Sequence, residues 1–464
     1  MPYANPPVRF DLPEARTPWQ GVLDAVERGP AAPHKIGEVP QIDATALVGL
    51  GSDGGDGDYL RANVWAPLHA NNAPVMVWIH GGGFVVGSKD APVNDGTHFA
   101  RSGVICMAIN YRMGIDGFLP VPGVPTNLGL RDMLFALAWV RDNIAAFGGD
   151  PANVTVFGES AGAMAIANLI ASPLAKGLFG RAIIQSGHGA MVRDIPVAQR
   201  IVNKLAAKLG VTPDADGFRN VSFEASWAAM EKLAKPWAVD LRDEGGHEPV
   251  FGISRFIPVW GDDVLPKKPI DALRDGVGAE VEVLIGTNTE EMNLYFVPTK
   301  VRRRIPGFLA RWLLSRSIPR AREILQAYGL KSKGVRPGEA MTLAMSDLVF
   351  RWPARQYADA HQGRTRVYEM DWRSPACGGE LGACHAIDVA FVFKTLECAS
   401  GPLGIAGENP PQELAESVHN IWADFARDGS LPWPEWDEDR FVYQLEAQRT
   451  VSEAPMPAAQ FLPS

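Results

Sequence analysis

The segment Gly158-Glu159-Ser160-Ala161-Gly162 has the spacing that places a serine at a sharp turn between a strand and a helix. An apolar run with β-branched residues precedes it, and a small-residue run of helical character follows it. Glycines on both sides leave room at a turn where a side chain would collide with neighbouring backbone. The start of a helix also directs backbone N–H groups toward the point of attack. The pattern therefore predicts that Ser160 is a nucleophile.

A second segment, Trp-Ile-His-Gly-Gly-Gly-Phe, ends an apolar run and contains His80 followed by three glycines. Acyl transfer builds negative charge on a carbonyl oxygen, and glycines let backbone N–H groups approach that oxygen closely. We expect Gly82 and Gly83 to donate two such hydrogen bonds and Ala161 to donate a third. Each segment alone is also compatible with a tight turn that has no chemical role. Both together, in this order, favour a site for acyl transfer.

The general base is sought late in the chain, because on such a scaffold the nucleophile is followed by the acid and then by the histidine. Of nine histidines, only His361, His385 and His419 lie in that region. His419 falls within a helical pattern, and His361 precedes the predicted strand 365–370 in a polar segment. His385 follows that strand in a loop, so we expect it to be the base, with a buried structural histidine as the alternative.

The acid of the triad should also follow a strand. The segment Val-Glu-Val-Leu-Ile-Gly-Thr-Asn-Thr-Glu-Glu-Met places Glu290 and Glu291 just beyond one. The spacing alone does not separate these two adjacent carboxylates. Either one remains a candidate on these residues.

The elements that must position these residues follow a regular alternation. Short apolar runs bounded by turn residues occur at 74–79, 104–110, 153–157, 181–185, 281–285 and 365–370. Segments of helical period lie between them, the clearest at 127–146. This alternation predicts an α/β fold with one mostly parallel, doubly wound sheet. We expect a single domain over 1–464, with insertions at about 191–268 and 292–338 that form a lid.

Composition and net charge limit the classes of molecule that the protein could bind. The chain has 464 residues, 46% of them hydrophobic, and its net charge of −9 argues against a nucleic-acid groove. A small, neutral substrate fits better. The longest apolar stretches, 134–140 and 164–171, are far too short to span a bilayer, so no transmembrane segment is expected. The first residues lack the pattern of a secretory signal, and we expect a cytoplasmic protein; no pattern indicates an oligomeric state.

Three other features have alternative interpretations. The four cysteines show no close-set framework, as expected of reduced thiols, and no tetrahedral metal spacing involves Cys377, Cys384 and His385. Asp53, Asp56 and Asp58 resemble a hairpin turn more than a calcium loop. A third feature is the arginine-rich segment 302–313, which also carries Phe308, Leu309, Trp312 and Leu313. It suggests either an amphipathic surface for lipid or, as we favour, a lid helix with a solvated basic face.

Several longer blocks show a resemblance to the type-B carboxylesterase family, which includes bacterial esterases and the cholinesterases. These blocks are NVWAP, WIHGGGF, NYRMGIDGF, NLGLRDMLFALAWVRDNIAAFGGDP, VTVFGESAGA, IIQSG and GACHAIDVAFVF. The resemblance runs from about Tyr59 to near Trp433. It implies an α/β-hydrolase fold with lid insertions and hydrolysis of small-molecule esters by the protein's own residues, without a metal or cofactor.

The resemblance also assigns residues. Matching the family's acid block onto Gly286, Glu290 and Glu291 makes Glu291 the acid of the triad. Ser186 corresponds to a family serine that supports the triad, and Glu159 to the family glutamate beside the nucleophile. The implied catalytic set is therefore Ser160, Glu291 and His385.

The chain departs from the family at four positions. Tyr59 replaces an early disulfide cysteine, Met133 a usual glutamine, and Met292 a glycine after the acid, which bears on the loop of Glu291. Trp260 stands where relatives carry a small residue, and we expect it to narrow the pocket, so that short to medium acyl chains are preferred. The alternative function is a binding or adhesion protein of the same fold. Such members usually lack part of the triad, which is complete here.

Overall fold

The computed structural model describes residues 1–53, 57–235, 237–246, 248 and 254–462 of the chain. Within these residues the largest sheet has nine strands: β1 (Ala62–Trp65), β2 (Ala73–Ile79), β3 (Ile105–Ile109), β4 (Gly149–Glu159), β5 (Arg181–Gln185), β8 (Glu282–Asn288), β9 (Thr365–Met370), β10 (Phe441–Gln444) and β11 (Arg449–Ser452). Their order is β1-β3-β2-β4-β5-β8-β9-β10-β11. Strands β3 to β10 are parallel in this order, and the edge strands β1 and β11 are antiparallel to their neighbours.

This sheet confirms the predicted fold class. All six predicted strands lie in it as β2, β3, β4, β5, β8 and β9. Strand β4 extends to both sides of the predicted 153–157, because it continues to the serine turn. Strands β1, β10 and β11 were not predicted. Each has only four residues, too few for a clear alternation of apolar and polar positions.

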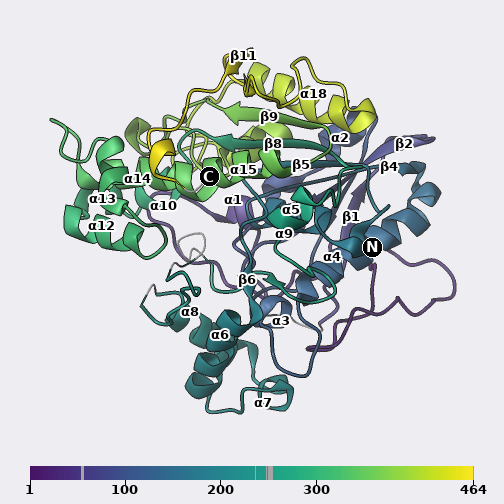
Figure 1. Ribbon diagram of the computed structural model, residues 1–464. Helices are drawn as coiled ribbons and strands as arrows, with labels where there is room; N and C mark the ends of the chain where they lie inside the picture. The colour runs from purple at the N-terminus through teal and green to yellow at the C-terminus, as the bar shows by residue number, and fades with distance from the viewer. Residues whose placement is uncertain (54–56, 236, 247, 249–253, 463–464) are drawn as a thin grey trace.

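Helices cover both faces of the sheet (Figure 1). They are α1 (Thr45–Val48), α2 (Thr97–Arg101), α3 (Gly114–Phe118), α4 (Leu128–Asn143), α5 (Ala161–Ile170), α6 (Ile195–Leu209), α7 (Ala215–Arg219), α8 (Phe223–Leu233), α9 (Pro269–Arg274), α10 (Asn293–Phe296), α11 (Val301–Arg304), α12 (Gly307–Ser315), α13 (Ala321–Ala327), α14 (Pro337–Ser346), α15 (Trp352–Ala360), α16 (Ile387–Val392), α17 (Leu396–Ala399) and α18 (Gln412–Asp428). The helix predicted over 127–146 is α4, which a short 3-10 turn over Ile144–Phe147 continues.

Two hydrophobic clusters lie on opposite faces of the sheet, as alternation along a strand requires. In β2, Val75, Val77 and Ile79 belong to the cluster that contains the buried faces of α4 and α5. The residues between them, Met76 and Trp78, belong to the cluster under α16 and α18. Because both faces of the central strands are covered, these strands are apolar throughout rather than alternating, which is the pattern of a doubly wound sheet.

The parallel strands end at one edge of the sheet, and the loops after them carry the polar residues of interest. Ser160 follows β4 and begins α5, Ser186 follows β5, and Glu291 follows β8. His385 lies in the loop between β9 and α16. The topology therefore brings residues that are separated by up to 225 positions to one edge.

The segment 191–268 contains α6, α7, α8 and a small sheet of β6 (Arg193–Asp194) and β7 (Val259–Trp260). The segment 292–338 contains α10 to α13 and the start of α14. In Figure 1, α12, α13 and α14 lie together beside one edge of the sheet, and α6 and α7 lie below it. No helix in the described part of the chain is long and apolar enough to cross a membrane.

Candidate active site

Ser160 lies on a strained turn between β4 and α5. Its φ is 55° and its ψ is −122°, a region that residues other than glycine rarely adopt. A Cβ at Gly162 would lie 1.9 Å from the carbonyl oxygen of Ile79, and one at Gly158 would lie 2.6 Å from the same oxygen. The two glycines are therefore required by the end of β2, which passes directly beside the turn. Ser160 is held by a 2.9 Å hydrogen bond from its N–H to the Gln185 carbonyl.

The glycine-rich loop after β2 is folded so that it faces this turn. Gly82 has a φ of 104°, and a Cβ there would lie 2.0 Å from the Val86 carbonyl oxygen. His80 is buried, stacks on Tyr111 with ring centroids 4.5 Å apart, and has its pKa lowered by burial to about 4. It therefore acts as a neutral support for the loop. Gly82, Gly83 and Ala161 line one cavity, and their N–H groups donate no hydrogen bond to another described residue.

His385 and Glu291 form a buried pair. Nδ1 of His385 lies 2.6 Å from Oε2 of Glu291, whose exposed fraction is zero. The other carboxylate oxygen, Oε1, accepts a 2.8 Å hydrogen bond from the N–H of Asn288. The backbone N–H of His385 also donates to the Glu291 carbonyl at 3.1 Å. The loop after β8 thus fixes the position of the imidazole and the tautomer in which Nδ1 carries a proton.

Glu290, the other candidate acid, has different partners. Its carboxylate pairs with Arg373 and accepts a 3.1 Å hydrogen bond from the N–H of Ala383. It forms no hydrogen bond or ion pair with His385. Met292, which replaces a family glycine, has a φ of −74°, so this loop needs no glycine at that position. Its N–H donates to Oγ of Ser346 at 3.0 Å.

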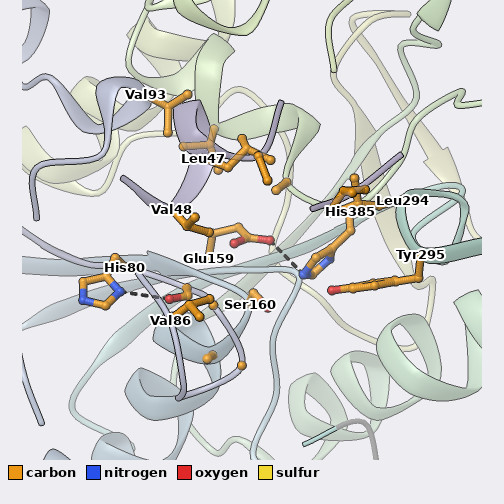
Figure 2. A pocket seen from close by; sticks show the side chains of 18 of the residues that line it. Leu47, Val48, His80, Val86, Val93, Glu159, Ser160, Leu294, Tyr295 and His385 are labelled. Carbon is orange, nitrogen blue, oxygen red and sulfur yellow. Dashed lines mark hydrogen bonds and ion pairs between the residues drawn. The ribbon is translucent and has the colours of Figure 1, made fainter. Parts of the chain in front are cut away.

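Glu159 reaches the other side of the imidazole (Figure 2). Its Oε1 lies 3.0 Å from Nε2 of His385, an ion-pair distance without the alignment of a hydrogen bond. Nε2 thus has no hydrogen-bond partner among the described residues, and Ser160 lies on the same cavity wall. Burial lowers the pKa of His385, but the charges of Glu159, Tyr295 and Glu291 outweigh it and hold this pKa well above its usual value.

Ser186 lies at the end of β5 with a φ of 52°, fully buried. Its N–H donates to the Gly286 carbonyl at 2.8 Å, which joins the end of β5 to the neighbouring strand β8. Its hydroxyl makes no hydrogen bond to another described residue. The observed contact of Ser186 is therefore through its backbone and not through its side chain.

A buried polar network behind the triad was not identified from the sequence. Asp388 accepts hydrogen bonds from Gln185 at 2.8 Å and from Asn288 at 3.2 Å, and Gln185 in turn accepts from Trp422 at 3.0 Å. Burial, together with the charge of Glu159, raises the pKa of Asp388 to about 6. The only signal in the sequence was the position of Asp388, three residues after His385. This spacing does not predict a contact with Gln185 or Asn288, because that contact depends on how the loop folds.

A cavity of about 460 Å³ opens in front of Ser160. Its walls are mainly apolar, and His385 is flanked by Phe350 and Tyr295, with ring centroids 4.6 and 5.7 Å away. One wall comes from residues 36–48, including Leu47 and Val48 of α1. Sequence reasoning missed this wall, because the segment is far from every motif and has no periodic pattern.

The expectation that Trp260 narrows this cavity is wrong. Trp260 lies in β7 and lines a separate cavity of about 180 Å³, where the ammonium group of Lys268 is 5.5 Å from its ring. The sequence showed only that Trp260 lies in an insertion and replaces a small residue of the family. In the structure, β7 pairs with β6, and this pairing places the Trp260 ring in the other cavity.

Among the described residues, no three His, Cys, Asp or Glu side chains form a group that could hold a metal ion. Asp56 of the possible calcium loop lies outside the described residues, and Asp58 is paired with Arg61 and Arg16. All four cysteines are free thiols.

Comparison with known proteins gives a consistent result. A model of the Carboxylesterase family matches residues 1–455. The chain is 34% identical over 475 residues to the para-nitrobenzyl esterase of Bacillus subtilis (strain 168), covering 98% of this chain and 92% of that protein. It is 32% identical over 459 residues to the phenmedipham hydrolase of Pseudarthrobacter oxydans, covering 95% and 89%.

Solved structures agree with these relatives. A structure of a PNB esterase matches with a TM-score of 0.84 at 32% identity, covering 100% of this chain and 95% of that one. A carboxylesterase of Geobacillus stearothermophilus at pH 6.2 matches with a TM-score of 0.81 at 31% identity, with the same coverage. These findings favour a catalytic role over the alternative of a binding or adhesion protein.

Proposed function

The chain belongs to the carboxylesterase family and hydrolyses carboxylic esters, and we propose that it does so through an acyl-enzyme formed on Ser160. The observation that carries this proposal is the buried 2.6 Å contact between His385 and Glu291, with His385 lining the same cavity as Ser160. Nucleophile, base and oxyanion donors all come from the protein, so the mechanism needs no cofactor.

In the first step Nε2 of His385 takes the proton of the Ser160 hydroxyl as its oxygen attacks the ester carbonyl. Glu291 keeps the imidazole in the productive tautomer and stabilises its charged form. Collapse of the tetrahedral intermediate releases the alcohol, which receives the proton from His385. Water then attacks the acyl-enzyme by the same route, and the carboxylic acid leaves with Ser160 restored.

The negative charge on the carbonyl oxygen is assigned to the N–H groups of Gly82, Gly83 and Ala161. All three groups lack another acceptor among the described residues and lie on the cavity wall. Donors that are fixed before the reaction stabilise the developing charge without reorganisation, which is usually a large part of such catalysis.

Glu159 is assigned a positioning role on the base. Its carboxylate contacts Nε2 of His385 at 3.0 Å and favours the imidazolium that forms during attack. Ser186 is assigned a supporting role through the backbone contact that joins the end of β5 to β8.

The insertions at about 191–268 and 292–338 are assigned the role of a lid on a single domain. Met191, Leu294, Tyr295 and Thr299 come from the two insertions and line the cavity in front of Ser160. Because the walls are apolar, we assign small, neutral esters of short to medium acyl length as substrates. The free, partly buried cysteines support a reducing compartment, and we place the protein in the cytoplasm.

Replacing Ser160 with alanine tests the proposal. We expect kcat on a soluble 4-nitrophenyl ester to fall by about 10⁴ to 10⁶, as in other triad enzymes. An organophosphate should label the parent enzyme on Ser160 and leave the variant unlabelled. Thermal unfolding of the variant should match the parent. A correctly folded alanine variant that keeps the parent rate shows that another group is the nucleophile.

A further inference from the structure

Positive charge is concentrated in one part of this acidic chain. Residues 300–336, which we call the basic lobe, contain eleven Lys and Arg and a single acidic residue, Glu323. The rest of the chain contains 33 basic and 52 acidic residues. The basic lobe is α11, α12 and α13 with their connections; α12 and α13 pack against each other, and all three helices pack against α14. In Figure 1 they lie beside one edge of the sheet, away from β1 and β2.

Most of this charge is not neutralised. Arg303, Arg316 and Arg320 pair with Glu380, Glu248 and Glu323. Seven other basic residues are exposed and form no ion pair within the described part of the chain: Lys300, Arg304, Arg311, Arg322, Lys331, Lys333 and Arg336. Seven of the eleven basic residues in the lobe therefore carry a positive charge that no ion pair within the described part of the chain balances.

Helix α12 adds exposed aromatic side chains to this charge. Phe308 is 72% exposed and Trp312 is 42% exposed, whereas Ala310 and Leu314 are buried. Phe308, Arg311 and Trp312 are spaced three and four residues apart, so they share one face of α12. The Arg316 guanidinium lies 5.5 Å from the Trp312 ring. Exposed aromatic rings among unpaired arginines are typical of helices that lie in a membrane interface.

We propose that the basic lobe docks on the surface of an anionic lipid bilayer. Phe308 and Trp312 enter the region of the lipid headgroups, and Arg304 and Arg311 pair with lipid phosphates. The charge complementarity also orients the molecule, because the remaining surface is acidic and is repelled by the same bilayer. A nucleic acid would satisfy the charge but would leave Phe308 and Trp312 in water, so lipid is favoured.

Docking would place the ester cavity close to the bilayer. Leu294, Tyr295 and Thr299 line that cavity, and the chain continues from Thr299 directly into the basic lobe at Lys300. The residues proposed to touch the bilayer include none of the residues assigned to the reaction. Binding to lipid and hydrolysis of a soluble ester can therefore be measured separately.

Co-sedimentation with vesicles tests the proposal. We expect the full chain to bind phosphatidylcholine vesicles that contain about 30% phosphatidylglycerol at low salt and not pure phosphatidylcholine vesicles. Binding should be lost between about 0.1 M and 1 M salt, where the screening length falls from roughly 10 Å to 3 Å. The double variants Phe308→Ser/Trp312→Ser and Arg304→Gln/Arg311→Gln should each bind at least about tenfold more weakly.

Matched controls change similar groups elsewhere. Leu68→Ser removes an exposed apolar side chain between β1 and β2, and Lys204→Gln/Lys208→Gln removes two exposed charges from α6. Both should bind vesicles like the parent, and all variants should hydrolyse a soluble 4-nitrophenyl ester like the parent. The proposal is overturned if the two vesicle types bind equally, if the controls weaken binding as much as the lobe variants, or if only duplex DNA is bound.

Discussion

Glu290 and Glu291 are adjacent, yet their carboxylates reach different partners. Both oxygens of Glu291 accept hydrogen bonds from N–H donors, Nδ1 of His385 and the backbone of Asn288. An amide at position 291 would have to face one of these donors with its own NH₂ group. Glu290 instead neutralises Arg373, which is largely exposed.

We therefore expect Glu291→Gln to lower kcat by about 10² to 10⁴, and Glu290→Gln to lower it by less than about tenfold. Steady-state kinetics on one soluble ester measures both, with thermal unfolding recorded for each variant. If both variants are folded and the change at Glu290 is the damaging one, the acid has been assigned to the wrong neighbour.

In the proposed mechanism, Glu159 helps to set the pH at which His385 becomes neutral and can act as the base. His385 must be neutral to accept the serine proton, but its pKa is held well above its usual value by Glu159, Tyr295 and Glu291 against the opposing effect of burial. The rate kcat/KM should accordingly rise with pH until well above 6.5, the usual pKa of histidine. Removing the carboxylate charge removes part of the preference for the imidazolium.

Glu159→Gln should move the acidic limb of the kcat/KM profile to lower pH by about one unit or more. The position of the limb is the informative quantity, because a purely structural loss would lower the rate at every pH and leave the limb in place. An unchanged limb in a folded variant contradicts the assigned role of Glu159.

Among the elements, the turn from β4 to α5 depends on the close approach of β2. A Cβ at position 162 would lie 1.9 Å from the Ile79 carbonyl and 2.8 Å from that of His80. The end of β2 leads directly into the glycine-rich loop, so displacing it also moves the N–H groups of Gly82 and Gly83.

Gly162→Ala should therefore lower the free energy of unfolding by at least about 1 to 3 kcal/mol and reduce kcat in the fraction that stays folded. Gly180→Ala is the matched control, since a Cβ there has no atom within 4 Å and its φ is not in the left-handed region. Denaturant unfolding and kinetics are compared for the two. Equal behaviour of the two variants would show that the close approach of β2 is not essential.

At the scale of the whole molecule, the ester cavity is closed by parts of the chain that are far apart in sequence. Val48 of α1, in the segment 36–48, lines the same cavity as Ser160, whereas Trp260 lines a different cavity. The size of the cavity therefore depends on Val48 and not on Trp260. One methylene in an apolar pocket changes selectivity by about tenfold or more.

Val48→Ala should raise the ratio of kcat/KM for 4-nitrophenyl octanoate over butyrate by about tenfold, and Val48→Phe should lower that ratio. Trp260→Ala should leave it unchanged. A panel of esters from acetate to palmitate measures all three variants. A shift in the Trp260 variant, with none in the Val48 pair, would place the acyl chain in the other cavity.

The predicted strands and the serine turn were recognisable because their signals are local. A run such as Val-Met-Val-Trp-Ile predicts a buried strand, and the spacing of Gly158, Ser160 and Gly162 predicts the serine turn from five consecutive residues. The order of the strands in the sheet and the short edge strands have no such local signal, so they were not predicted. Chain order reduced the nine histidines to three, and the loop position after the predicted strand 365–370 then selected His385 as the candidate base.

The sequence by itself therefore determined the fold class, the family, and Ser160 and His385 as the candidate nucleophile and base, because each rests on patterns that can be recognised along the chain. The resemblance to the family added Glu291 as the candidate acid. Only the tertiary structure separated Glu290 from Glu291 by their partners, brought Glu159 and Asp388 to the triad, and built a cavity wall from residues 36–48. It also moved Trp260 away from that cavity. These are contacts between distant segments, and their formation depends on how the helices and loops pack, which no local spacing encodes.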